Sequence, residues 1–413
     1  MRIKTIEVQN QKFLFDGNGL KIYETDNFDQ FNAKYFLTAE APRSLQTEYV
    51  RTVCLVLNNS CNLTCSYCYA NKGVYDFPNE QMTLESAKEI IDPLMKLVSN
   101  NGGVELTVAF FGGEPLLSMK LITAIVDYME TSRGYLKCNY KITTNGTLLS
   151  QDNVDFMENH NFEVMISLDG DKKRHDTHRI FVNGKGSYDR VAKNITLFKN
   201  KNKLNARITV TNSNVDIYSY FNGILDLGFN RLTYALDSRI SPEDFSIFAG
   251  SLRAMLSQYI SDIRNCRYYE ITNLSLALVP LLTSRGYMSH CNAGTSYITK
   301  SADGTIYKCP RFIGDNNYLY RFDKINIIHK EDRDRGIEIE VKDRNLLACE
   351  TCEYLYICGG VCSFHSKKGG NVAYECQHRK ILFEKTLELI CSLTKSQRRQ
   401  FILYLNSVWT ELR

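Results

Sequence analysis

The sequence predicts an α/β fold in which a parallel sheet curls into a partial (β/α)6 barrel of the TIM-like kind. Six short apolar segments typical of strands lie between residues 52 and 236, and helical stretches separate them. Such alternation favours parallel strands joined by right-handed crossovers. Polar motifs follow four of these strands, where a barrel carries its chemistry. A hydrophobic share of 44% is enough for a full core.

The elements follow in a simple order along the chain. Residues 13–23 read as two strands around the Asp16-Gly17 turn, which predicts a small N-terminal extension over residues 1–50. Residues 51–240 form the barrel, with strands at 53–57, 106–110, 140–143, 164–168, 206–210 and 232–236 and helices at 84–98, 120–131 and 217–227. We expect a helical linker over 241–290, a cysteine-rich domain over 291–379 and amphipathic C-terminal helices over 380–413.

Charge and hydropathy exclude several classes of partner. The chain has 50 Lys and Arg against 46 Asp and Glu, a formal net charge of +4, and the basic residues are dispersed, so we expect no nucleic-acid binding. No apolar stretch is long enough to span a membrane. The first seven residues alternate polar and apolar side chains, unlike a secretion signal. These features predict a cytoplasmic protein.

Three of the 14 cysteines form the motif CxxxCxxC directly after the first strand: Cys61, Cys65 and Cys68. In a reducing compartment grouped cysteines are usually metal ligands or catalysts rather than disulfides. A [4Fe-4S] cluster normally takes four thiolates, so three leave one iron open to another ligand. A zinc site usually needs four protein ligands, and no fourth stands close in this loop. The motif therefore favours an iron–sulfur cluster.

Further polar motifs follow the next strands. Gly112-Gly113-Glu114 comes after the second strand, where two glycines permit close backbone approach to a ligand. Asn145 follows the third strand and Ser167 ends the fourth, with Arg179 beyond it. Any one of these could be a turn or a cap. Four at successive strand ends indicate a shared site.

With the aromatic Tyr67 before the third cysteine, residues 52–240 resemble the core of radical S-adenosylmethionine (SAM) enzymes. The resemblance implies that the open iron binds SAM, which one electron cleaves to methionine and a 5′-deoxyadenosyl radical. It also implies the cofactor contacts. Gly112, Gly113 and Glu114 would hold the methionine amino end, and Asn145 the ribose. Ser167 and Arg179 would hydrogen-bond the cofactor, with the guanidinium suited to its carboxylate.

Seven later cysteines resemble the SPASM pattern of auxiliary-cluster domains: Cys291, Cys309, Cys349, Cys352, Cys358, Cys362 and Cys376. The resemblance implies two auxiliary [4Fe-4S] clusters, and thus three in all. One would be held by Cys349, Cys352, Cys358 and Cys376, and the other by Cys291, Cys309 and Cys362. The second set is one ligand short. Either Cys266 or another group completes it, or one iron stays open to a substrate thiolate.

Radical SAM enzymes with SPASM domains mostly modify peptides, and the chain resembles the sactipeptide and ranthipeptide maturases that form thioethers. We therefore expect a ribosomally made precursor peptide with a leader as substrate, an intramolecular crosslink as product, and flavodoxin or ferredoxin as electron donor. The alternative is an anaerobic sulfatase-maturating enzyme. That family has an Asp base directly after the second auxiliary cysteine, where this chain has Pro310. A non-enzymatic electron carrier is a third interpretation, but it would not need Gly112 or Arg179.

The remaining candidates have weaker signals. Tyr234, Asp237 and Arg239 follow the sixth strand, and we interpret them as ordinary polar rim residues. His290 could adjust the neighbouring cluster or be exposed. The pattern designates no general base, so the catalytic residue stays unassigned.

Overall fold

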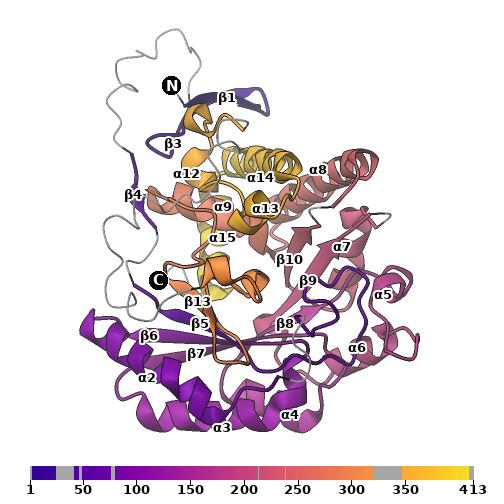
Figure 1. Cartoon of the computed structure of the whole chain (residues 1–413). Coiled ribbons are helices and arrows are strands. Elements are labelled where there is room, and N and C mark those ends of the chain that lie inside the picture. Colours follow the sequence, from indigo (N-terminus) through magenta and orange to yellow (C-terminus); the bar gives the residue numbers. More distant parts are fainter. Residues whose placement is uncertain are drawn as a thin grey trace.

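The computed structural model describes residues 2–24, 41–45, 49–75, 80–212, 214–237, 239–319 and 347–408 (Figure 1). Within these ranges no helix combines the length and apolar character needed to cross a lipid bilayer. The parts of the sequence-based expectations that fall on the other residues lie outside the described chain.

The six predicted strands are present and lie in sequence order in one parallel sheet. They are β5 (Thr52–Val56), β6 (Glu105–Phe111), β7 (Lys137–Thr144), β8 (Glu163–Ser167), β9 (Leu204–Val210) and β10 (Arg231–Leu236). Along β6 and β8, fully buried residues alternate with partly buried ones, so the two faces of the sheet differ. The predicted α/β class with parallel strands is thus confirmed.

Helices follow the strands as the periodicity predicts. They are α2 (Leu84–Asn100), α3 (Met119–Ser132), α4 (Gln151–Asn159), α5 (Lys172–His178), α6 (Tyr188–Ile195) and α7 (Ile217–Asp226). The hydroxyl of Thr83 accepts from the Ser86 amide and so caps the first turn of α2. Helices α2, α3 and α4 lie together along one side of β6 and β7 (Figure 1).

The sheet is larger than predicted, because three further strands extend it at both sides. The short strand β11 (Glu270–Ile271) pairs with β10, and β13 (Tyr297–Lys300) pairs in parallel with β5. The strand β14 (Ile306–Tyr307) then pairs with β13. Residues 297–300 fall in the region expected to form a separate cysteine-rich domain. They are instead part of the central sheet, with Ile298 and Thr299 completely buried.

The N-terminal hairpin belongs to a three-stranded antiparallel sheet of β1 (Ile3–Val8), β2 (Gln11–Asp16) and β3 (Lys21–Glu24). This sheet packs against the cysteine-rich segment: the Phe15 ring stacks on Tyr354 at 6.3 Å. The Gly17 backbone lies so near Glu353 that a Cβ would stand 2.0 Å from its carbonyl oxygen. A further pairing joins β4 (Arg43–Ser44) to β12 (Arg285–Gly286).

Four long helices belong to the second half of the described chain, and one of them, α14, packs against β1. They are α8 (Pro242–Arg264), α9 (Thr272–Thr283), α14 (Val372–Ser392) and α15 (Lys395–Val408), and the shorter α12 (Leu355–Cys358) and α13 (Ser363–Lys367) lie near them (Figure 1). Helix α14 packs on α8 and α9. It also runs through residue 380, where the sequence suggests a boundary, so Cys376 and the C-terminal apolar residues share one helix.

Candidate active site

One cavity of about 1140 Å³ occupies the inner face of the parallel sheet. Alternate residues of the strands line it, among them Thr107, Thr143, Met165 and Thr209. The polar motifs that follow β6 and β7 also line it, through Gly112, Gly113 and Asn145. Two cysteine-containing regions that are far apart in sequence contribute as well. The cavity is lined by the CxxxCxxC cysteines and by two later ones: Cys61, Cys65, Cys68, Cys291 and Cys309.

Every residue that the resemblance assigns to SAM also lines this cavity. These residues are Tyr67, Gly112, Gly113, Glu114, Asn145, Ser167 and Arg179. They come from the cysteine loop and from the ends of β6, β7 and β8, together with the end of α5. Their roles stay predictions, but the fold brings all of them to one cavity.

Two glycines allow the cysteine loop to sit against the end of β6. A Cβ on Gly113 would stand 2.1 Å from the Ser60 carbonyl oxygen, and one on Gly73 would stand 2.9 Å from Cys61 Cβ. Backbone hydrogen bonds also fasten the loop to the segment after α5. The Thr64 amide donates to the Ile180 carbonyl at 2.8 Å, and the Ser66 amide donates to the His178 carbonyl at 3.1 Å. The loop is therefore held from two sides.

Glu114 is fully buried, and its carboxylate joins two strand ends. It accepts hydrogen bonds from the Thr144 hydroxyl at 2.6 Å, the Asn145 amide at 2.8 Å and the Leu116 amide at 3.1 Å. Burial nevertheless raises the pKa of this carboxyl, with the hydrogen bonds opposing the shift. These three hydrogen bonds fix the Glu114 side chain and tie the end of β6 to the end of β7, while Glu114 still lines the cavity with Gly112 and Gly113.

Asn145 connects the β7 end to the cysteine loop. Its Nδ2 donates to Asn62 Oδ1 at 2.9 Å and lies 3.8 Å from Cys61 Sγ. Its Oδ1 accepts from the Thr147 amide and hydroxyl. The amide of Asn145 is thus fixed beside a predicted cluster ligand.

A buried polar network joins the loop to β8 and β9. The Tyr67 hydroxyl donates to Asp169 Oδ2 and accepts from Arg179 Nη1. Asp169 Oδ1 accepts from the Thr209 amide at 2.9 Å. Sequence reasoning missed Asp169, although it stands in the motif Ser167-Leu168-Asp169-Gly170 at a strand end. The Arg179 Nε is buried and has no hydrogen-bond partner among the described residues.

Electrostatic interactions connect the later cysteines within two sets, and their assignment to two clusters stays a prediction. Burial first, and then the nearby Cys358, Cys352 and Cys349, raise the pKa of Cys376 to about 11. Burial first, and then Cys362 and Cys309, raise the pKa of Cys291 to about 12.

The part of the chain described here holds no set of three or more His, Cys, Asp or Glu side chains around one metal ion. A four-iron cluster binds each thiolate through a different iron and does not need such convergence.

Comparison with protein families identifies the domain that carries most of this cavity. The model described as "Radical SAM superfamily" matches residues 55–220, which run from β5 into α7. This chain contains a radical SAM domain. A radical SAM domain implies one [4Fe-4S] cluster and SAM.

The curated relatives of this radical SAM chain are named as enzymes. It is 25% identical over 369 residues to the radical SAM cyclopropyl synthase TigE of Paramaledivibacter caminithermalis, covering 83% of this chain and 75% of that protein. It is also 25% identical over 374 residues to a cysteine-type anaerobic sulfatase-maturating enzyme of Clostridium novyi, covering 82% and 96%. The radical SAM match and the names of these relatives support an enzyme that carries a radical SAM domain.

Solved structures share the fold. The structure of anSMEcpe with bound AdoMet, which is SAM, matches with a TM-score of 0.66 and 21% identity over 82% of this chain and 98% of that one. Streptococcus suis SuiB bound to precursor peptide SuiA matches with a TM-score of 0.53 and 17% identity, covering 78% and 74%.

The residues of the radical SAM domain fit the groups that the family implies. Three thiols of one loop line the cavity, and burial raises the pKa of Cys61 to about 11. A bound cluster would oppose this shift, because a metal stabilises the thiolate. The unpartnered Nε of Arg179 is a donor that a carboxylate of SAM could use. The inner wall therefore suits a cluster with SAM on its open iron.

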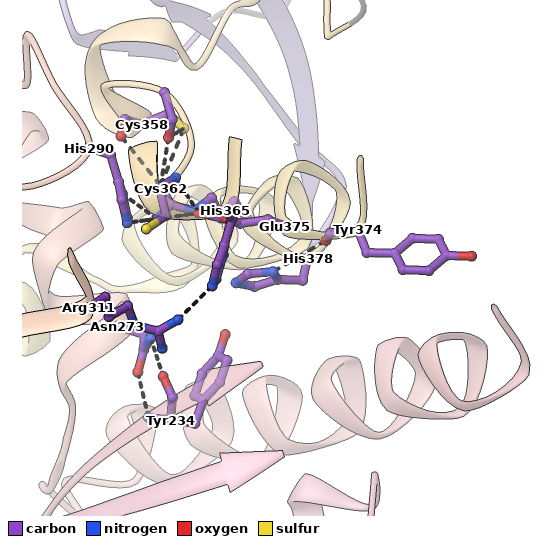
Figure 2. Close-up of polar contacts among 12 residues, drawn as sticks. Tyr234, Asn273, His290, Arg311, Cys358, Cys362, His365, Tyr374, Glu375 and His378 are labelled. Atoms are coloured by element: carbon purple, nitrogen blue, oxygen red, sulfur yellow. Dashed lines mark hydrogen bonds and ion pairs between the residues drawn. The ribbon is translucent and has the colours of Figure 1, made fainter. Parts of the chain in front are cut away.

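A second polar network surrounds the later cysteines (Figure 2). Glu375 accepts from the Cys362 amide and from His365 Nδ1, each at 2.8 Å. His365 Nε2 accepts from Arg311 Nη1 at 2.8 Å. The Arg379 guanidinium contacts His290 and donates to the Gly360 carbonyl at 3.0 Å. This network connects the Cys358–Cys362 segment to Arg311 at the cavity wall.

The remaining candidate residues differ in whether they line the cavity. Cys266 does not line the cavity; its Sγ lies 3.7 Å from Gln400 of α15, so the suggestion that it completes the Cys291 set is wrong. Asp237 and Arg239 do line the cavity, as a salt bridge of 2.7 Å. Tyr234 does not, because its ring is buried against Phe248.

Proposed function

We propose that this radical SAM enzyme is a peptide maturase that abstracts hydrogen from a ribosomally made precursor peptide and forms an intramolecular crosslink, a Cys thioether. The supporting observation is the single cavity shared by Cys61, Cys65 and Cys68 and by Cys291 and Cys309. A radical made at one end and a second redox group at the other would face the same substrate. The SuiB structure with its precursor peptide supports a peptide in this fold.

We propose that residues 291–379 are a SPASM domain with two auxiliary [4Fe-4S] clusters, in addition to the one on Cys61, Cys65 and Cys68. The first cluster and SAM would supply a radical able to abstract hydrogen. Gly112 and Gly113 would let the backbone meet SAM, and Arg179 would bind its carboxylate. The Cys291 set offers three thiols, so an open iron there could bind a substrate thiolate.

Two further partners belong to the proposal. A leader peptide could add a strand to an edge of the β1–β2–β3 sheet, since extended segments bind exposed strand edges in this way. An external donor such as flavodoxin or ferredoxin would supply the electron.

A second candidate is a sulfatase-maturating enzyme, which two relatives and the anSMEcpe structure favour through long coverage. Pro310 stands where that family has its Asp base, and Pro310 lines the cavity without a titratable group. The cavity carboxylate of Asp237 is already paired with Arg239. These features favour crosslinking.

The test incubates reduced, iron-reconstituted enzyme with SAM and the short peptides encoded beside its gene. We expect 5′-deoxyadenosine and a peptide that has lost two hydrogens, keeps its sulfur and resists thiol alkylation. Loss of sulfur with a hydrazide-reactive aldehyde would instead establish formylglycine formation. Iron analysis should give about twelve atoms per chain for three four-iron clusters, and a value near four would exclude the auxiliary pair.

A further inference from the structure

Arg207 and Arg311 are two of the five arginines, besides Arg179, that line the cavity. Arg207 lies on β9, and Arg311 follows Cys309 in the short turn Pro310–Phe312. Within the described residues, neither guanidinium has a carboxylate partner at ion-pair distance, and the Arg207 side chain has no hydrogen bond either. Burying a cation without an anionic partner costs folding free energy, so an unpaired guanidinium in a cavity indicates a binding site for an anion.

The two positive charges also act on each other. Burial lowers the pKa of Arg207 to about 10, and the charge of Arg311 is the next contribution. Arg207 therefore stays charged near neutral pH. Two guanidinium groups within electrostatic range in one cavity repel each other, and an anion between them would relieve this repulsion.

The nearest carboxylates of the protein are engaged elsewhere. Asp237 accepts from Arg239 Nη2 at 2.7 Å and from its Nε at 3.0 Å, which is a bidentate pair. Asp169 accepts from the Tyr67 hydroxyl and the Thr209 amide. Neither acid is within ion-pair distance of Arg207 or Arg311, so the anion has to come from a ligand.

Arg311 is held in a fixed position by its surroundings. Its guanidinium carbon lies 5.2 Å from the Tyr69 ring centre and 5.5 Å from that of Phe364. Figure 2 shows His365 between Arg311 and Glu375, with His365 Nδ1 facing the carboxylate at 2.8 Å and Nε2 facing Arg311. The imidazole thus accepts from one amino group of Arg311 and leaves the rest of the guanidinium for a ligand. A pre-positioned guanidinium loses little entropy on binding a planar carboxylate.

On the basis of the proposed function, we propose that Arg207 and Arg311 bind a carboxylate of the peptide substrate and so orient the residue to be modified. The carboxylate would come either from an Asp or Glu side chain or from the peptide C-terminus. The SAM carboxylate is matched separately by Arg179, which contacts the cysteine loop through Tyr67.

The experiment measures binding without turnover. Reconstituted full-length enzyme with SAM is titrated with three blocked tripeptides under saturation-transfer NMR: one with a central Glu and an amidated end, its Gln counterpart, and a Gly tripeptide with a free C-terminal carboxylate. We expect the Gln peptide to bind about tenfold or more weakly than at least one of the two acids, as for loss of a charge-assisted hydrogen bond. Which acid binds identifies the source of the carboxylate.

Variants assign the binding to the two arginines. Arg207→Gln and Arg311→Gln should each weaken the acidic peptide about tenfold, while SAM binding stays unchanged. Arg285→Gln is the matched control, since Arg285 lines the same cavity but already donates to the Ser44 carbonyl at 2.7 Å. Arg207→Gln should also leave the melting temperature unchanged or raise it, because an unpaired cation is removed. Arg207→Lys, which keeps the charge but loses the fork geometry, should bind with intermediate affinity.

Several results would overturn the assignment: equal binding of the Glu, Gln and free-acid peptides, no binding of any of them, or equal effects of Arg285→Gln and the other two variants. Loss of SAM binding in Arg207→Gln would show that Arg207 binds SAM rather than the peptide. Failure of the proposed function looks different, because the precursor peptide would then gain no crosslink while arginine-dependent binding of the acidic peptide persisted.

Discussion

Tyr67 shows how one side chain can organise the site. It stands between two cysteines of CxxxCxxC, and its hydroxyl donates to Asp169 and accepts from Arg179. Burial, in the first place, holds the pKa of Tyr67 well above its usual value, so the hydroxyl keeps its proton at any working pH. A neutral donor and acceptor between a buried acid and a buried base keeps all three groups bonded. The sequence suggests the aromatic ring through the family resemblance, but not these partners.

Replacing Tyr67 by Phe should reduce the free energy of unfolding by about 1–3 kcal/mol, because Asp169 and Arg179 each lose a buried hydrogen bond. Denaturant unfolding of the reconstituted enzyme under anaerobic conditions measures it. Tyr69→Phe is the matched control two residues away: Tyr69 is 45% exposed and its hydroxyl lies 3.5 Å from that of Tyr75, so the loss should be below about 1 kcal/mol. Equal losses for the two variants would refute the role given to Tyr67.

At the level of elements, the site depends on strand ends that bring loops together. The end of β6 supplies Gly113, and the end of β7 supplies Thr144 and Asn145, which hold the buried Glu114. The segment after α5 fastens the cysteine loop from the other side. The order of these elements follows from the sequence. Their contacts required the structure, because a hydrogen bond between residues 114 and 145 has no local pattern.

The close approach of the cysteine loop to Gly113 gives a test at this scale. Gly113→Ala would place a Cβ 2.1 Å from the Ser60 carbonyl oxygen, so the loop must move. We expect lower iron content after reconstitution and a lower melting temperature. Gly250→Ala in α8 is the control, since nothing lies within 4 Å of its Cβ position and Ala is the better helix former by about 1 kcal/mol. Full iron content in Gly113→Ala would contradict this account.

At the scale of the whole molecule, a described strand from beyond residue 290 joins the sheet of the six predicted strands. Strand β13, from beyond residue 290, pairs with β5 along Thr52 to Leu55 and covers the side of that strand away from β6. Residues from before and after position 290 therefore line the cavity together. Cys291 precedes β13 and Cys309 follows β14, so this strand pair places both cysteines at the cavity.

Ending the chain after residue 290 should expose the edge of β5 and produce aggregated protein, because an apolar unpaired strand edge associates with other chains. Soluble yield and size-exclusion chromatography measure this. A chain ending after residue 394 loses α15 but keeps β13, so we expect it to stay soluble, with a lower melting temperature from the loss of the buried Phe401 and Leu405. A soluble, monomeric 1–290 fragment would show that β13 is dispensable.

The α/β class, the order of six strands and the candidate residues at their ends could be predicted from the sequence, because hydrophobic periodicity and short motifs are local properties. The sequence also predicted which cysteines group together, through the spacing of a known pattern. Only the tertiary structure decided that β13 completes the sheet and that Asp169 supports Tyr67 and Arg179. The structure also places Cys266 beside Gln400, away from the cavity, and it places Arg207 near Arg311. Each of these facts joins residues far apart in the chain, and such pairings arise from packing and burial rather than from any local sequence signal.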